Sequence, residues 1–531
     1  MTTIQDLPDE LYILIAAYLT TSTLNSLIRS CKSLHSAFIP FLWSELTSTS
    51  KVINVDHVRA HAHHVETLHY SAIQNEEHYT IVYPRLQSLR LDKYSDRKRR
   101  YIDINSKPSI VQHQISSQIK VQFARRHPTV RKLIYRQEET LPMEFWETVE
   151  TDWRGLESLE IFSLVEVDAV DSFWKVCDRL QSLDMYGVTL PSSSLILSTL
   201  SFRHLQDLKI NIFDGAEDTV YRPWPLQLLE QVMKGSKGLR RLEWFVREHL
   251  FPTQMVQEAL AEGCWPELCE LLIKDHTLSE QDVTNVLRRL PSRRLNVLEL
   301  WGGFGPLSYG HIREMTLFDH LKDLRLIRCA GATSKITQEI MTECVHLVHL
   351  EVPYIYVRDI ATASKPWGCL KLEDLTVYIT KQAGDEAGWE LKAFQQISKL
   401  RELRKLNLQR DAQGTVFAPE SQIEAIWGAE TLNLKLPSES SSTDSNELDC
   451  TSSNSEGDLR CWSSLELMEE FTFDGGEDLG MEEMVWMTEH WKNLRQVCGQ
   501  FLDAEEKGVR MDRFFAEKGI LYFTFCVFSM K

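Results

Sequence analysis

Four histidines, at positions 57, 61, 63 and 64, form the densest set of potential metal ligands in the chain. His57 and His61 would share one face of a helix, a spacing that can ligate zinc. No nearby cysteine or carboxylate takes a matching position, so a solvated connector is the favoured interpretation over a metal site. Cys264 and Cys269 also lack a second pair. The sequence therefore predicts no metal and no cofactor.

The chain contains no recognisable motif for covalent or phosphoryl-transfer chemistry. Its most glycine-rich segment, Gly302-Gly303-Phe304-Gly305-Pro306, lacks the following lysine of a phosphate-binding loop. It is expected to be a loop after a strand. No nucleophile elbow is present either. We therefore expect no catalytic residues, and a function based on binding.

The charge distribution excludes general nucleic-acid binding. The 531 residues carry 58 Lys/Arg and 76 Asp/Glu, a net charge of −18. Residues 1–136 hold 18 basic and 11 acidic residues, so the remainder has 40 against 65, a net charge of −25. A body this acidic would repel a phosphate backbone. There is no secretory signal and no apolar run long enough for a membrane span. The eleven cysteines without paired spacing indicate reduced thiols, as in a cytoplasmic or nuclear protein.

An internal repeat determines the expected architecture. The pattern Leu-x-x-Leu-x-apolar begins at Leu86, Leu156, Leu180, Leu205, Leu268, Leu295, Leu321, Leu347, Leu372 and Leu403, with weaker copies at Val65, Val130, Leu239, Met468 and Leu494. From Leu156 to Leu403, successive copies lie 24 to 34 residues apart. Such a period predicts one short strand and one helix per unit, with leucines pointing into a core that only stacked units can close.

The copy beginning at Leu321 is the cleanest, because Cys329 follows its strand pattern and Ile336-Thr337 opens the next helix pattern. This copy resembles the cysteine-containing class of leucine-rich repeats. Most other copies lack the cysteine, so the array is degenerate. The resemblance implies a curved, horseshoe-shaped α/β solenoid.

The N-terminal 46 residues predict a short helical unit. Pro8 suits a first helical turn, and Asp9 and Glu10 complement the positive end of a helix dipole. Apolar residues then recur at helical spacing: Leu11, Ile15 and Leu19 in one run, and Leu24, Leu27, Cys31, Leu34 and Phe38 in a second, which could bend partway. So small a unit buries too little surface to be stable alone. We therefore expect it to need a partner.

This segment resembles the F-box, whose pattern runs Leu-Pro-x-Glu, apolar helix positions, Cys-Lys and Pro-x-Leu-Trp. Ser30 and Leu34 depart from the pattern, and an unrelated amphipathic helical cap is the alternative. The resemblance implies a three-helix unit that binds a Skp-type adaptor through Leu7, Pro8, Leu11, Ile15, Leu19, Leu24, Leu27, Cys31, Pro40 and Trp43.

Proteins that join an F-box to leucine-rich repeats form a known family, which this chain resembles as a divergent member. The resemblance implies a non-catalytic substrate receptor of a ubiquitin ligase, in which the adaptor binds a cullin and the repeats hold a protein client. Two alternatives stay open. One is an F-box scaffold without ligase function, and the other is a metal-binding or enzymatic repeat protein.

The expected domains are an F-box at 1–46, a connector at 47–64, a repeat array at 65–500 and a C-terminal cap at 501–531. A basic insert near 92–128 contains Arg97-Lys98-Arg99-Arg100, either a nuclear import signal or a solvated segment. Residues 437–461 hold ten Ser/Thr and six Asp/Glu and predict a disordered loop. Ser441, Ser453 and Ser455 there match an acid-directed kinase pattern, which is common by chance.

Strand alternation also predicts a client-binding surface. If the leucines point inward, the intervening and following residues point to the concave face. Those residues are rich in acidic and aromatic types, which would select a client with basic and aromatic or apolar character. Alternatively, the carboxylates keep the strands soluble and the aromatic rings pack on neighbouring strands. The candidate client-binding residues are Glu160, Phe162, Asp184, Tyr186, Glu243, Phe245, Glu299, Trp301, Glu351 and Tyr378.

Overall fold

The computed structural model divides the chain into two compact units. The first comprises Met1–Arg241, Phe245–His249 and Gly263–Pro266, and the second comprises Leu242–Trp244, Leu250–Glu262 and Glu267–Lys531. The structure describes residues 7–48, 53–71, 76–92, 117–137, 141–162, 165–186, 201–212, 226–246, 252–290, 294–382, 385, 388–408, 459–473, 481–499 and 513–524. The basic run at 97–100 and nearly all of the predicted loop at 437–461 lie outside these ranges.

Three helices open the first unit: α1 (Asp9–Ala17), α2 (Thr21–Ile28) and α3 (Lys32–Ser44). The Thr20 side chain caps α2 by accepting a hydrogen bond from the Thr23 backbone N–H. Phe38 is fully buried at the centre of the three helices. The second apolar run therefore forms two separate helices, and Cys31 lies exposed at the start of α3.

Parallel strands follow in chain order in the first unit. They are β1 (Glu45–Ser48), β2 (Thr67–Ser71), β3 (Ser88–Asp92), β4 (Lys132–Arg136), β5 (Ser158–Phe162), β6 (Ser182–Tyr186) and β7 (Asp207–Ile212), each paired with the next. The connecting helices are α4 (Val55–His61), α5 (Ser117–Arg126), α6 (Met143–Asp152), α7 (Val170–Asp178) and α8 (Leu226–Gly235), with short 3₁₀ turns η2 (Ala62–His64), η3 (Glu76–Thr80) and η5 (Val167–Ala169).

The second unit repeats this arrangement. Its parallel strands, also paired in chain order, are β9 (Glu270–Lys274), β10 (Val297–Trp301), β11 (Asp323–Ile327), β12 (His349–Tyr356), β13 (Asp374–Thr380), β14 (Lys405–Leu408), β15 (Glu470–Phe473), β16 (Gln496–Gly499) and β17 (Leu521–Thr524). The helices are α9 (Thr253–Ala261), α10 (Glu280–Leu287), α11 (Pro306–Glu314), α12 (Ser334–Glu343), α13 (Val357–Ala361), α14 (Trp389–Ile397) and α16 (Met481–His490), with η6 (Leu317–Asp319) and η7 (Leu459–Ser464). The residues of β8 (Arg241–Val246) are divided between the two units.

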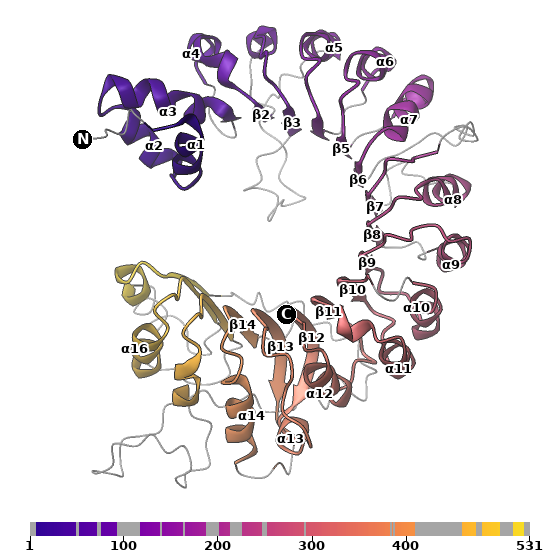
Figure 1. The fold of residues 1–531 in the computed structure, drawn as a ribbon, viewed down its shortest axis with the longest axis vertical. Coiled ribbons are helices and arrows are strands. Elements are labelled where there is room, and N and C mark those ends of the chain that lie inside the picture. Colours follow the sequence, from indigo (N-terminus) through magenta and orange to yellow (C-terminus); the bar gives the residue numbers. More distant parts are fainter. Residues whose placement is uncertain are drawn as a thin grey trace, which may run out of the picture. The chain divides into compact units, whose positions relative to one another are not determined.

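The strands confirm the predicted repeat in detail. Every predicted copy, ten strong and five weak, has a strand that begins two residues after its first apolar residue, from Val65 with β2 to Leu494 with β16. The second and third apolar positions point into the core; in β11, for example, Leu324 and Leu326 are fully buried. Within each unit the strands line one side and the helices the other (Figure 1). The prediction of stacked parallel strand–helix repeats is therefore confirmed.

The strand–helix pattern also extends into residues 47–64, which were predicted to be a connector. Strand β1 begins at Glu45, directly after α3, and pairs in parallel with β2. Helix α4 then packs in the position of a repeat helix, with Val58 fully buried. Asn54 caps α4 by accepting hydrogen bonds from Asp56 N–H and His57 N–H. The N-terminal helices are thus joined to the sheet by a further repeat. Within the described residues, no helix is long and apolar enough to cross a membrane.

A buried histidine joins two repeats of the first unit. His127 is fully buried, its Nδ1 lies 2.7 Å from the Phe123 carbonyl, and its Nε2 accepts a hydrogen bond from the Tyr83 N–H at 2.9 Å. Nε2 must be unprotonated to accept this bond, so the ring is neutral with its proton on Nδ1. Burial is the main cause that lowers the pKa of His127 to about 4.

This histidine predicts acid sensitivity of the first unit. In an unfolded chain His127 would titrate near the ordinary value of about 6.5, so the unfolded state binds more protons as the pH falls below that value. Above about pH 6.5 the first unit keeps its full free energy of unfolding. As the pH falls from about 6.5 to about 4, roughly 3 kcal/mol of this free energy is lost because His127 stays neutral only in the folded state. Hydrogen exchange of β3 and β4, measured between pH 4 and 7.5, should show this fall as a slope of the unfolding free energy against pH.

The variant His127→Gln keeps an acceptor for Tyr83 N–H without a titrating ring, so its slope should be shallower. His57→Gln changes an exposed histidine of α4 and should leave the slope as it is. Equal slopes in the wild type and His127→Gln would contradict the assignment.

Candidate functional site

The histidines of the N-terminal region make ring contacts instead of forming a metal-binding group. Trp43, near the end of α3, stacks on His61 with 4.5 Å between ring centroids, and the rings of His63 and His64 lie 3.8 Å apart. Partial burial, and then the neighbouring histidines, lower the pKa of both His61 and His64. Among the described residues, no group of three or more His, Cys, Asp or Glu side chains is placed to hold a metal ion.

Helix α1 presents a large apolar surface to solvent. Leu11 is 40% exposed, Leu14 is 55% exposed and Tyr18, just after the helix, is 88% exposed. These residues are three and four positions apart, so they lie on one side of the helix; Ile13, on another side, is 55% exposed. We call Leu11, Leu14 and Tyr18 the α1 face. Large side chains left exposed together in this way indicate an interaction surface.

The predicted adaptor-binding residues fall into two groups. Leu24 is buried, and Ile15, Leu19 and Leu27 pack against the small core of the three helices. Pro8, Leu11 and Cys31 are exposed, and Leu7, Pro40 and Trp43 are half-buried. The structure therefore packs the first group against the core of the unit and, within the second, leaves Pro8, Leu11 and Cys31 exposed. The prediction omitted Ile13, Leu14 and Tyr18, although the spacing of Leu11, Leu14 and Tyr18 carried a helical signal of its own.

In the first unit, the strand side chains that point away from the leucine core form what we call the open strand face. Glu160 on β5 pairs with Arg136 on β4, and Asp184 on β6 lies 4.0 Å from Lys209 on β7. The rings of Phe162 and Tyr186, on adjacent strands, are 5.4 Å apart. These four candidate client-binding residues are half-buried, as is Phe245, the fifth candidate of this unit.

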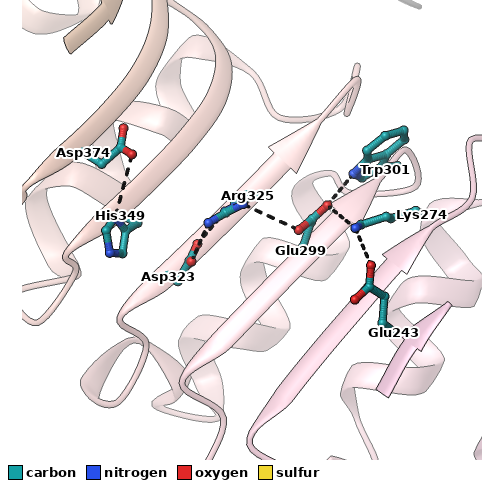
Figure 2. Close-up of polar contacts among 8 residues, drawn as sticks. All are labelled: Glu243, Lys274, Glu299, Trp301, Asp323, Arg325, His349 and Asp374. Atoms are coloured by element: carbon teal, nitrogen blue, oxygen red, sulfur yellow. Dashed lines mark hydrogen bonds and ion pairs between the residues drawn. The ribbon is translucent and has the colours of Figure 1, made fainter. Parts of the chain in front are cut away.

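In the second unit, the open strand face carries a chain of ion pairs that crosses successive strands (Figure 2). Lys274 Nζ lies 2.6 Å from Glu243 Oε1 and 3.6 Å from Glu299 Oε1. Trp301 donates its indole N–H to Glu299 at 2.7 Å. Glu299 is only 4% exposed, so these contacts occupy a carboxylate that is almost removed from water.

The chain of charges continues through Arg325 on β11. Its guanidinium bonds Asp323 at 3.0 Å and lies 3.9 Å from Glu299. Burial alone would lower the pKa of Arg325, but the hydrogen bond with Asp323 and the charges of Asp323, Glu299 and Glu351 raise it overall. On β12 and β13, His349 lies 3.9 Å from Asp374, whose pKa is raised mainly by burial.

These contacts qualify the predicted client-binding surface. The five acidic candidates, Glu160, Asp184, Glu243, Glu299 and Glu351, each have an intramolecular cation as a partner or close neighbour. Among the aromatic candidates Tyr378 is 4% exposed, whereas Phe245 and Trp301 are half-buried. A basic client would have to displace the protein's own cations. Client binding at these residues stays a prediction, and so does the alternative that they serve solubility and packing.

The ion pairs around Glu299 predict a local stability effect. Glu299→Gln keeps the shape and an acceptor for Trp301, but leaves Lys274 and Arg325 without this buried charge. Losing a charged partner in a nearly buried site costs about 1–3 kcal/mol of unfolding free energy. The measurement is native-state hydrogen exchange of β9, β10 and β11, compared with the wild type.

Glu267→Gln is the matched control, because Glu267 pairs with Arg294 where both side chains are about half exposed. Exposed pairs contribute little, so this variant should change the same free energy by less than about 1 kcal/mol. If both variants had the same small effect, the ion pairs of the open strand face would be no stronger than ordinary surface pairs.

Comparison with known proteins gives a distant likeness in structure. No family model and no curated protein sequence matches the chain. Among solved structures, it is similar to a chain of the crystal structure titled as the Rad7 and Elc1 complex in yeast, at 11% sequence identity and a TM-score of 0.43. The match covers 97% of this chain and 92% of that one.

Proposed function

We propose that this protein is the substrate receptor of a Skp–cullin–F-box ubiquitin ligase. Its N-terminal helices bind a Skp-type adaptor, the adaptor links it to a cullin, and the repeat array holds a protein client. The observation that carries this proposal is the α1 face, an exposed apolar surface on a three-helix unit that immediately precedes a strand–helix array. The proposal also rests on the F-box pattern of residues 7–43.

The energetics of the three helices support binding of a partner. Only Ala16, Leu24 and Phe38 form their buried core, with partly buried side chains around them. A unit with so small a core gains little stability from burial alone. Covering Leu11, Leu14 and Tyr18 would remove further apolar surface from water at roughly 25 cal/mol per Å². An adaptor groove that takes an apolar helix face would do this.

In this proposal the protein accelerates ubiquitin transfer by proximity. The client is held on the array while a conjugating enzyme in the same complex reaches its lysines, so the chain itself needs no catalytic residue. Because the client is tethered, the rate of ubiquitin transfer depends on the effective concentration of its lysines near the conjugating enzyme and not on a bimolecular encounter. Action of this kind would take place in the cytoplasm or the nucleus, where we propose that the protein resides.

An adaptor-binding scaffold without ligase function is the second candidate. The observation that favours it is the neutralisation of the open strand face, because carboxylates paired with Lys274 and Arg325 offer less to a basic client. Purification under mild conditions separates the two candidates. Adaptor together with cullin supports the receptor, whereas adaptor without cullin supports the scaffold.

The proposal predicts the effect of charge on the α1 face. Leu14→Glu and Tyr18→Glu each place a carboxylate where an apolar adaptor surface should sit, and should lower capture of a recombinant Skp-type adaptor at least about tenfold. Both positions are more than half exposed, so the fold should be retained. Capture is measured by co-purification, and helicity by circular dichroism.

Asn25→Glu provides a control, because Asn25 is exposed on α2 and outside the α1 face. It adds the same charge to the same small unit and should leave capture unchanged. Normal capture by Leu14→Glu and Tyr18→Glu would overturn the proposed adaptor surface.

A further inference from the structure

We propose that the turns preceding β12, β13 and β14 form a surface that binds an acidic protein segment with large apolar side chains. The surface consists of Val345, Leu370, Lys371 and Arg401, here called the edge patch. It lies at the amino ends of the strands and shares no residue with the α1 face or the open strand face. The inference therefore goes beyond the proposed function and does not depend on it.

The three turns have the same backbone conformation, because the same two hydrogen bonds recur in each. One bond runs from a backbone N–H to the carbonyl two positions earlier, at 3.1, 2.9 and 3.0 Å for Val345, Leu370 and Arg401. The other runs to the carbonyl three positions earlier, at 3.3, 3.1 and 3.0 Å for the N–H groups of Leu347, Leu372 and Leu403. The strands that follow pair in parallel, with equivalent positions opposite one another about 4.8 Å apart. Val345, Leu370 and Arg401 therefore form one row across three repeats.

Two large apolar side chains of this row are exposed. Val345 is 46% exposed and Leu370 is 50% exposed. A Cβ added at Gly368 would lie 3.3 Å from Val345 Cγ1, so Val345 packs against the turn that carries Leu370. The Gly368 N–H donates to the Met341 carbonyl at 2.9 Å, which ties this turn to α12. The apolar pair is thus held in place before a partner arrives, which lowers the entropic cost of binding.

Cations flank the apolar pair. Lys371 directly follows Leu370, and Arg401 continues the row in the next repeat; both are exposed. Within the part of the chain that the structure describes, neither side chain takes part in an ion pair or a hydrogen bond. The neighbouring Glu402 is also exposed but pairs with neither of them. Both cations are therefore available to carboxylates from outside.

The next residues along the chain show that pairing is possible in this region. Arg404 lies 2.9 Å from Glu469, and Lys405 lies 2.7 Å from Glu470. The chain also carries 76 acidic against 58 basic residues, so carboxylates are in excess. Cations left unpaired in such a chain, beside exposed apolar side chains, are complementary to a partner that is both acidic and apolar.

An acidic segment with a large apolar residue would satisfy both parts of the edge patch. Its carboxylates would accept charge-assisted hydrogen bonds from Lys371 and Arg401, and its apolar side chain would cover Val345 and Leu370. A nucleic acid backbone would satisfy the cations alone and would be repelled by the net negative charge of the chain.

The test uses the full chain and three immobilised libraries of short degenerate peptides. The first library combines Asp and Glu with Leu and Phe, the second combines Asp and Glu with Ser and Asn, and the third combines Lys and Arg with Leu and Phe. The wild type should be retained at least about tenfold better on the first library than on either other, because only the first matches both parts of the edge patch. Equal retention on the first and second libraries would indicate a general polyanion surface and would overturn the proposal, as would equal retention on the first and third.

Two changes test the apolar and the charged part separately. Leu370→Ser should lower retention on the first library about tenfold, because it removes the larger apolar side chain. The double variant Lys371→Glu and Arg401→Glu should lose the preference for the first library and be retained on the third library better than the wild type. All three positions are exposed, so the melting temperature should stay close to that of the wild type.

Leu307→Ser and Lys392→Glu are the matched controls. Leu307 on α11 is 58% exposed, Lys392 on α14 is exposed, and neither belongs to the edge patch. Both variants should be retained like the wild type. A preference for the first library that survives Leu370→Ser and the double charge reversal would overturn the edge patch as the site, and so would an equal loss of preference in the control variants.

Discussion

The structure depends on apolar burial that no single repeat can achieve. Each strand–helix unit offers a few leucines, such as Leu324 and Leu326 on β11, and these become fully buried only because the adjacent units cover them. The parallel register pairs equivalent positions, with Leu324 opposite Leu298 on one side and Leu350 on the other. A shift of one residue would turn the leucines outward, so the register is strongly determined.

The same register creates an electrostatic problem on the open strand face. Equivalent positions of successive repeats lie about 4.8 Å apart, so equal charges would face one another. In the second unit Arg325 lies between Glu299 and Glu351, and the charges alternate. In the first unit Glu160 lies directly opposite Asp184, and Arg136 and Lys209 provide the compensating charges. Many of the carboxylates that the sequence places on this face are therefore paired with cations of the same chain.

Because these strand carboxylates are paired within the chain, the loops at the ends of the strands become the better candidates for binding a partner. Strand side chains are constrained by neighbours on both sides. Loop side chains such as His276 and Arg328 are free of the strand register, and the positions from which they project are set by close packing between loops. Recognition by loops on a rigid scaffold is the usual arrangement in proteins.

The repeats could be predicted from the sequence because their signal is local. Leucine spacing placed the start of every strand from β2 to β16, even in the weak copies at Met468 and Leu494. The orientation of α1 was harder to predict: Leu11, Ile15 and Leu19 were all predicted to bind the adaptor, but Ile15 and Leu19 pack against the core and Leu11 is exposed. Several apolar stripes were possible on this helix, and packing against α3 selects among them. Contacts between loops, such as that between His276 and Arg328, could not be predicted, since they depend on loop conformations and join residues 52 positions apart.

The central claim is that the N-terminal helices dock an adaptor while the repeat array stays available. Hydrogen–deuterium exchange of the full chain, with and without a recombinant Skp-type adaptor, tests it most directly. The account predicts slower exchange in α1 when the adaptor is present, with little change in β9 to β13. Protection confined to the strands of the array, or no protection anywhere in the chain, would contradict it.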